Sequence, residues 1–304
     1  MMKMVLLAAV SACYCLFAVA CIGMTPTGVT IRSDNYSAIM VTSDLSVGTN
    51  RVSFGLVDME SHPVQSDSVD VTSVYFPPEQ KNGILKEQVT AQFVHWPPYD
   101  GSKGVFVTEL YFDIKGAATV TDPGLWGLEI SGLTKDGTQI EARTALTVNE
   151  LSKTPAIGDV APVSSTPTSM DVSDLGHITS DLDPDPDLYK VSIDEAILED
   201  KAAVIIFSTP AFCVSATCGP QLEIIKTIKA RYSGVNFIHV EAFQDPHLIK
   251  EGVASLDPVH AMDEWGLITE PWTFILDSDG RVRAKFEQFV TEDEIIVALE
   301  EALS

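Results

Sequence analysis

Two cysteines offer the clearest chemistry in this chain of 304 residues. Cys213 and Cys218 lie in the stretch FSTPAFCVSATCGPQ, residues 207–221, with four residues between them. Two thiols this close in sequence form either a structural disulfide or a redox couple that exchanges disulfides with other thiols. The residue types alone leave both alternatives open.

A regular helix could not hold this pair as a disulfide. Residues five positions apart lie about 140° apart around a helix and about 7.5 Å apart along it, whereas a disulfide needs Cα atoms about 4.4–6.8 Å apart. Pro220 favours the first turn of a helix, so we predict that the helix starts at Gly219–Pro220, with Cys218 at or just before its N-terminus. Cys213 then lies in the preceding loop, where the bond can close and the free amides of the helix start favour a thiolate.

The segments around the pair alternate between strand and helix patterns over residues 189–304. Capping boxes at Ser192/Glu195 and Thr291/Glu294 predict two helix starts. The remaining signals are, in order, a buried strand (AAVIIF), an amphipathic helix (PQLEIIKTIKARY), a second buried strand (VNFIHVEAF) and a hairpin (WTFILDSDGRVRAKF). We therefore predict an α/β domain with the element order of a thioredoxin fold.

The motifs VIIF, FC, CGP and EPWTFILDSDGRV resemble the membrane-anchored extracytoplasmic thioredoxin-like (redoxin) proteins, over roughly residues 154–304. The resemblance implies that the protein acts on the disulfides or thiols of a partner protein: one of Cys213 and Cys218 attacks a partner's sulfur and the other resolves the mixed disulfide. It also implies that Pro271 is the cis-proline that shapes the partner groove. The usual Cys-x-x-Cys is absent, and Gln221 stands where a second cysteine would follow Cys218.

Other families use different cysteine spacings. The loop TPAFCVSATCG is similar to that of peroxiredoxins of the bacterioferritin-comigratory type, which would make the protein a thiol peroxidase. However, Thr209 lies four residues before Cys213 rather than three, and Glu270 and Pro271 stand where the activating Arg is expected. Copper chaperones of the Sco kind combine Cys-x3-Cys with a His that this chain lacks. The non-enzymatic alternative is a surface binding module with a structural disulfide.

No cofactor or metal site is predicted from the residue pattern. His62 and His95 are isolated from other ligand types, and we expect both at the protein surface.

Residues 41–149 carry short alternating strands separated by Pro, Gly, Asp and Asn. This pattern predicts an all-β sandwich with Trp126 in its core. Segments such as SVGTNRVSFGLVDMESHPV and PGLWGLEISG resemble the immunoglobulin-like domains of the YtkA and CopC kind.

Residues 150–188, rich in Pro, Ser, Thr and Asp, predict a linker or an extended arm.

The N-terminus predicts export. Residues 1–21 have the pattern of a signal peptide, and AVAC, which ends at Cys21, resembles a lipobox in which the cysteine is lipidated. Residues 22–40 are expected to be a tether. We therefore predict an extracytoplasmic protein that is either a membrane-anchored lipoprotein or secreted or periplasmic. A net charge of −24 argues against nucleic-acid partners.

Overall fold

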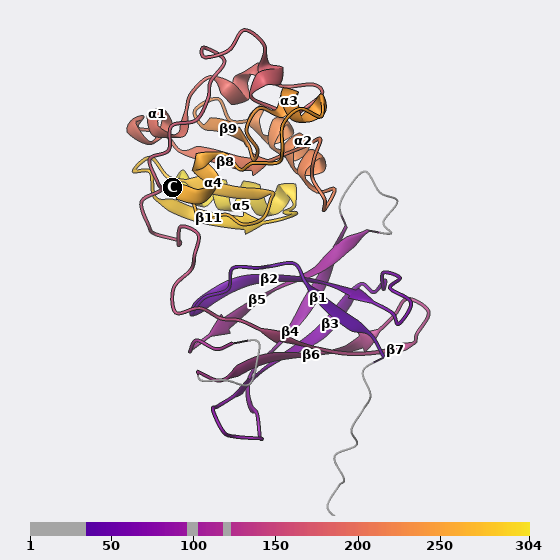
Figure 1. Ribbon diagram of the computed structural model, residues 1–304. Coiled ribbons are helices and arrows are strands. Elements are labelled where there is room, and N and C mark those ends of the chain that lie inside the picture. The colour runs from indigo at the N-terminus through magenta and orange to yellow at the C-terminus, as the bar shows by residue number, and fades with distance from the viewer. Residues whose placement is uncertain (1–34, 96–102, 118–122) are drawn as a thin grey trace, which may run out of the picture. The chain divides into compact units, whose positions relative to one another are not determined.

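The computed structural model describes residues 35–95, 103–117 and 123–304 (Figure 1). The predicted signal peptide, with the lipidation site Cys21, lies outside these residues, as does most of the predicted tether. Among the helices that are described, none combines the length and the apolar composition needed to cross a membrane.

The described residues from 35 to 149 contain one antiparallel sheet with the strand order β1-β2-β5-β4-β3-β6-β7. Its strands are β1 (Ser37–Met40), β2 (Gly48–Val57), β3 (Ser68–Phe76), β4 (Ile84–His95), β5 (Gly104–Phe112), β6 (Leu125–Leu133) and β7 (Gln139–Leu146). The backbone amides of Asn35 and Tyr36 both donate to the Glu141 carbonyl oxygen, at 3.1 and 3.2 Å, so the first and last strands come close to closing the sheet on itself. The sheet begins at Ser37, inside the segment expected to be a tether.

The core of this β region follows the predicted alternation of apolar and polar residues. Trp126 is fully buried and its indole N–H donates to the Ile114 carbonyl oxygen at 2.9 Å. The rings of Phe54 and Phe106 stack beside it in the same apolar cluster. His95, at the end of β4, is exposed, as expected for an isolated surface histidine. The prediction of an all-β region with Trp126 in its core is confirmed.

The C-terminal region contains a four-stranded sheet with the order β11-β10-β8-β9. Strands β8 (Ala203–Ser208) and β9 (Asn236–Glu241) are parallel, and β10 (Trp272–Leu276) is antiparallel to both β8 and β11 (Val282–Glu287). The helices are α1 (Ile193–Leu198), α2 (Cys218–Lys229), α3 (Pro246–Lys250), α4 (His260–Glu264) and α5 (Glu292–Ala302). Helix α2 connects the parallel pair and α5 follows the hairpin, which is the predicted thioredoxin arrangement.

Helices cover both faces of this sheet, which explains the continuous apolar run of β8. Ile205 and Phe207 pack with α1 and α4, whereas Val204 and Ile206 pack with α2 and α5. Every residue of β8 is therefore buried. Both predicted capping boxes are present, at Ser192/Glu195 before α1 and Thr291/Glu294 before α5.

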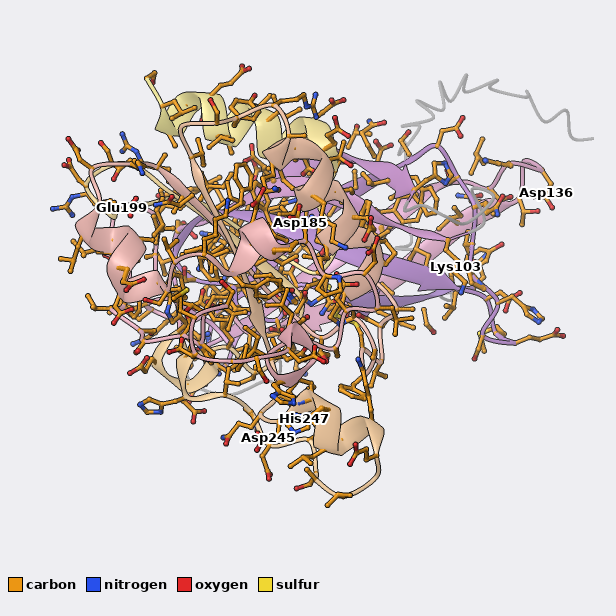
Figure 2. The ribbon with its side chains drawn as sticks, turned by 90° about the horizontal axis from the view of Figure 1, so that it is seen from above. Lys103, Asp136, Asp185, Glu199, Asp245 and His247 are labelled. Carbon is orange, nitrogen blue, oxygen red and sulfur yellow. A yellow bond between two sulfur atoms is a disulfide. The ribbon has the colours of Figure 1, made fainter. Side chains whose placement is uncertain are left out.

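The segment predicted as a linker or arm packs against the α/β region. The Gly158 amide donates to the Val282 carbonyl oxygen at 2.8 Å, beside the edge strand β11. Further along, the segment forms the 3-10 helices η1 (Leu175–His177) and η2 (Pro186–Tyr189). His247 of α3, labelled in Figure 2, contacts His177 of η1, with ring centroids 4.4 Å apart and the rings tilted by 39°. This part of the chain is an ordered arm of the α/β region, and the division of the whole chain into two domains stays a prediction.

Candidate functional site

Cys213 and Cys218 form a disulfide at the start of α2, and their Cα atoms lie 6.0 Å apart. Strand β8 ends at Ser208, and Cys218 is the first residue of α2. The loop between them supplies Cys213, as the position of Pro220 predicts. The extra residues between the cysteines therefore lie ahead of the helix, where they let the bond form without unwinding it.

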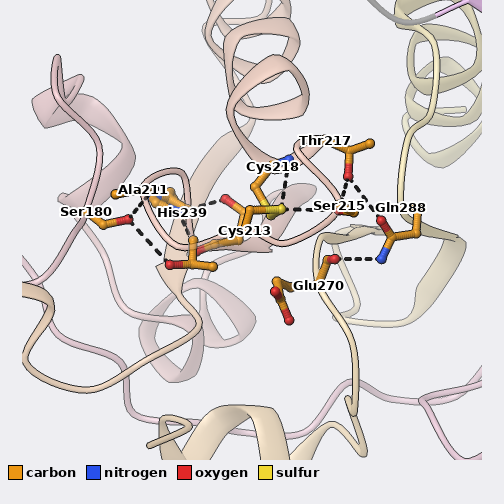
Figure 3. The surroundings of a disulfide bond; sticks show 11 residues. Ser180, Ala211, Cys213, Ser215, Thr217, Cys218, His239, Glu270 and Gln288 are labelled. Carbon is orange, nitrogen blue, oxygen red and sulfur yellow. Dashed lines mark hydrogen bonds between the residues drawn. A yellow bond between two sulfur atoms is a disulfide. The ribbon is translucent and has the colours of Figure 1, made fainter. Parts of the chain in front are cut away.

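The two sulfurs differ in access to solvent. Cys218 is fully buried, whereas Cys213 is partly exposed. The Cys218 backbone N–H lies 3.4 Å from the Cys213 sulfur, and the Ser215 hydroxyl lies 3.2 Å from it (Figure 3). The N–H is a donor that would stabilise negative charge on Cys213 after reduction, whereas the Ser215 hydroxyl donates to the Thr217 hydroxyl at 2.7 Å. Cys213 is thus the sulfur that an external reactant can reach and that the loop favours as a thiolate.

Glu270 brings a carboxylate to the same place. One of its carboxylate oxygens and the two sulfurs all lie within 4.8 Å of one another, the one such group of three ligand-type side chains found among the described residues. Burial raises the pKa of Glu270. The Glu270–Pro271 peptide bond is cis, as the resemblance to thioredoxin-like proteins implies for Pro271.

Gln288 joins the Glu270 segment to the start of α2. Its Nε2 donates to the Glu270 carbonyl oxygen at 2.6 Å, and its backbone N–H donates to the Pro271 carbonyl oxygen at 2.7 Å. Its Oε1 accepts a hydrogen bond of 3.0 Å from Thr217, the residue before Cys218. One side chain therefore fixes two segments that are distant in sequence (Figure 3).

Gln221 has a structural position. It is fully buried, and its Oε1 accepts a hydrogen bond of 2.9 Å from the Val290 backbone N–H. It connects α2 to the segment between β11 and α5. The missing second cysteine of a Cys-x-x-Cys motif is thus replaced by a residue that holds the helix in place.

The start of the loop between β8 and α2 is held by hydrogen bonds that lead to a buried acid, Glu241. The Ala211 N–H donates to the Ser180 hydroxyl at 3.1 Å, and the Ser180 N–H donates to the Glu241 carboxylate at 2.6 Å. Burial raises the pKa of Glu241. Thr209 is fully buried within 3.5 Å of the Ser180 hydroxyl. Its hydroxyl is part of this anchor.

The structure places Cys213, Cys218 and the segment that carries Pro271 close together. Sequence reasoning missed Glu270, Gln288 and Ser215. Glu270 could have been found, because it directly precedes a proline that was expected to face the cysteines. Gln288 carries no signal in the sequence, because its contacts depend on how β11 ends beside the other two segments.

Comparisons with known proteins give no family assignment. No protein-family model matches the chain, and no curated protein matches it. A thioredoxin-family thiol:disulfide interchange protein from Chlorobium tepidum is 18% identical and covers 47% of this chain and 100% of its own, with a TM-score of 0.28. MTB dsbF is 18% identical and covers 35% of this chain and 84% of its own, with a TM-score of 0.29. StoA from Bacillus subtilis is 14% identical and covers 40% and 93%, with a TM-score of 0.29. With TM-scores this low, these similarities carry no argument about this chain.

Proposed function

We propose that this protein is a thiol–disulfide oxidoreductase that acts on protein partners through Cys213 and Cys218. The observation that carries the proposal is the asymmetry of the pair: a partly exposed sulfur that receives a backbone N–H donor at the start of α2, bonded to a fully buried one. A permanent structural disulfide needs no such donor on one partly exposed sulfur. A ring this short also constrains the unfolded chain by only on the order of 2 kcal/mol.

The reaction follows from which sulfur is accessible. The Cys213 thiolate attacks one sulfur of a partner disulfide, an S–S bond forms between the proteins, and the other partner sulfur leaves as a thiolate. The Cys218 thiolate then attacks the Cys213 sulfur, which closes the intramolecular disulfide and releases the second partner thiolate. Two electrons pass from this chain to the partner, and the reverse sequence oxidises a partner dithiol. Pro271 lines the groove in which the partner segment lies.

The peroxidase alternative fits the site poorly. A carboxylate, that of Glu270, stands where a peroxide-activating guanidinium would be needed. Thr209 is buried and is hydrogen-bonded to the Ser180–Glu241 anchor, so its hydroxyl is engaged away from Cys213. We therefore expect slow reduction of peroxides.

The proposal extends to the rest of the chain. The strand order β1-β2-β5-β4 followed by β3-β6-β7 is the order of the strands in the two sheets of an immunoglobulin constant-type sandwich, although here β4 also pairs with β3 in one continuous sheet. We infer an immunoglobulin-like domain over residues 41–149, extended at its start by β1 (Ser37–Met40), and a thioredoxin-like domain over 189–304. The protein acts outside the cytoplasm, anchored through a lipid on Cys21. Mass spectrometry of the membrane fraction should find acylated Cys21, and an unmodified chain that begins elsewhere would defeat the anchor.

Single-cysteine variants of the mature protein test the exchange reaction. Cys213→Ser should reduce exchange with a model disulfide to background, because the attacking sulfur is gone. Cys218→Ser should accumulate a mixed disulfide with the partner, because attack remains and resolution is lost. If neither variant changes the exchange rate, the disulfide is a structural one and the protein is a binding module.

A further inference from the structure

The carboxylate of Glu270 faces the two sulfurs without a partner of its own. The hydrogen bonds and ion pairs of the described residues include the Glu270 backbone carbonyl but not its carboxylate. A half-buried carboxylate with no donor costs free energy whenever it is ionised. The position of this carboxylate beside two sulfurs therefore points to a proton or a cation that binds there.

Reduction of the disulfide makes this arrangement electrostatically unfavourable. Two thiolates and a carboxylate would put three negative charges within 4.8 Å of one another. Like charges at such distances repel by about 4 kcal/mol per pair near a protein surface. Residues 209–217 contain no Lys, Arg or His that could offset them. The reduced site must bind either protons or a cation.

We propose that the reduced protein binds one zinc ion through the sulfurs of Cys213 and Cys218 and the carboxylate of Glu270. Zinc accepts this mixture of thiolate and carboxylate ligands, at about 2.3 Å for sulfur and about 2.0–2.2 Å for oxygen. The ligand atoms of a tetrahedral site then lie roughly 3.3–3.8 Å apart. The three donor atoms of this site already lie within 4.8 Å of one another.

The Cα separation of 6.0 Å lets the two sulfurs share one ion once the bond between them is broken. The sulfur of Cys213 can move away from Cys218 by side-chain rotation, because it lies in a partly exposed loop. Three protein ligands leave the fourth zinc position to water. The partial exposure of Cys213 and Glu270 gives the ion a route of entry.

Gln288 supplies the outer support that such a site requires. Its hydrogen bonds to the Glu270 and Pro271 carbonyl oxygens fix the backbone that carries the carboxylate. Its bond with Thr217 fixes that backbone relative to the start of α2. Residues that orient ligands in this way commonly change metal affinity about 10–100-fold when they are replaced.

Zinc binding would make the metal-bound and disulfide forms mutually exclusive. The ion takes both thiolates, releases the remaining thiol protons to solvent and leaves no free sulfur to attack a partner. The sequence pattern predicted no metal site, because Glu270 lies far from the cysteines along the chain. The proposal requires only that the disulfide can be reduced, so it can fail or hold independently of the exchange reaction.

Titration of the reduced mature protein with Zn²⁺, in competition with a chromophoric chelator, tests the site. We expect one equivalent to bind the reduced protein and none to bind the oxidised protein. Co²⁺ in place of zinc should give a thiolate-to-cobalt charge-transfer band and the visible bands of tetrahedral cobalt. Glu270→Gln should weaken zinc binding at least about tenfold. Glu251→Gln, at an exposed position in the same region, should bind like wild type.

Two further measurements isolate the role of the carboxylate. Glu270→Asp should retain part of the zinc affinity, and Cu(I), which prefers thiolates, should bind wild type and Glu270→Gln alike. Equal zinc affinity in wild type and Glu270→Gln would overturn the proposal. So would an equal loss of Cu(I) and zinc affinity, which would mean that the substitution disturbs the thiols. A change in the pH profile of thiol alkylation in Glu270→Gln, without zinc binding to wild type, would show that the site binds protons instead.

Discussion

Two polar clusters of the α/β region, one around His239 and one around the two sulfurs, differ in whether their ionisable side chain has hydrogen-bond partners. His239 of β9 is buried, and both of its ring nitrogens have partners: Nδ1 lies 2.7 Å from the Tyr189 hydroxyl and Nε2 lies 2.9 Å from the Ser208 hydroxyl. Nε2 also lies 3.2 Å from the Ser208 carbonyl oxygen, which can only accept, so Nε2 carries the proton. The Glu270 carboxylate, beside the sulfurs, is half-buried and makes no hydrogen bond to the described residues.

The contrast distinguishes polar groups that stabilise the fold from polar groups that can bind a ligand or a proton. A satisfied neutral imidazole fixes the packing of β8, β9 and η2 and gains nothing from a ligand. An unsatisfied carboxylate beside one partly exposed and one buried sulfur gains from any cation or proton that arrives. The partners of a buried group, more than its burial, therefore indicate which of the two clusters has a chemical role.

The largest effect on stability should come from protonation of His239. Burial lowers its pKa from 6.5 to about 4. Between these values the unfolded chain binds a proton that the folded protein excludes, so stability falls as the pH falls through this window. From pH 7 to pH 5 the free energy of unfolding should fall by about 2 kcal/mol through this residue alone. Guanidinium denaturation of wild type and His239→Gln at both pH values measures it.

His260→Gln is the matched control, because the His260 side chain is 83% exposed. It should keep the wild-type dependence on pH, whereas His239→Gln should lose this part of it. An identical pH dependence in wild type and His239→Gln would mean that the pKa of His239 is the same in the folded and unfolded chain, so that the fold does not exclude its proton.

A smaller effect on the free energy of unfolding is expected from Gln288, which supports the sulfur cluster of Cys213, Cys218 and Glu270. Gln288→Ala removes the side-chain bonds to Glu270 and Thr217. The free energy of unfolding should fall by about 1.5 kcal/mol, since each bond contributes about 0.5–1.5 kcal/mol. The alkylation rate of reduced Cys213 should change as well, because the segments around it lose their connection.

Gln80→Ala controls for the loss of a glutamine side chain, because Gln80 is exposed in the β region. Neither stability nor the Cys213 alkylation rate should change in this variant. If Gln288→Ala lowers stability but leaves the alkylation rate unchanged, Gln288 supports the fold and does not position the sulfur cluster.

What the sequence could predict depended on how local the signal was. Pro220 placed the start of α2 correctly relative to Cys218, and the capping boxes placed the starts of α1 and α5, because each of these signals acts within one helical turn. The continuous apolar run of β8 identified a strand covered on both faces. These local features were sufficient for the thioredoxin arrangement.

Features that depend on distant contacts were missed. Helices α3 and α4 have five residues each, too few for a helical period to show. Strand β1 is held by backbone hydrogen bonds to β2, which leave no mark on residue type. The Glu270 carboxylate meets the sulfurs only because β10 lies beside β8, so tertiary structure, and not spacing, creates the candidate metal site.

The smallest effect concerns the backbone between the two cysteines. Ala216 has a φ of 60°, a left-handed conformation that costs an L-residue roughly 1–2 kcal/mol. Ala216→Gly removes this cost but adds about 0.5–1 kcal/mol of unfolded-chain entropy. The oxidised protein should therefore gain stability, by less than about 1 kcal/mol. Ser215→Gly, beside it, adds the same entropy, loses the hydroxyl near the Cys213 sulfur and should lower stability. Denaturation of both oxidised variants compares the two. Equal losses of stability in the two variants would show that Ala216 is not held in the left-handed conformation. The loop between the cysteines would then carry no backbone strain and would not differ in this respect from the cluster around His239.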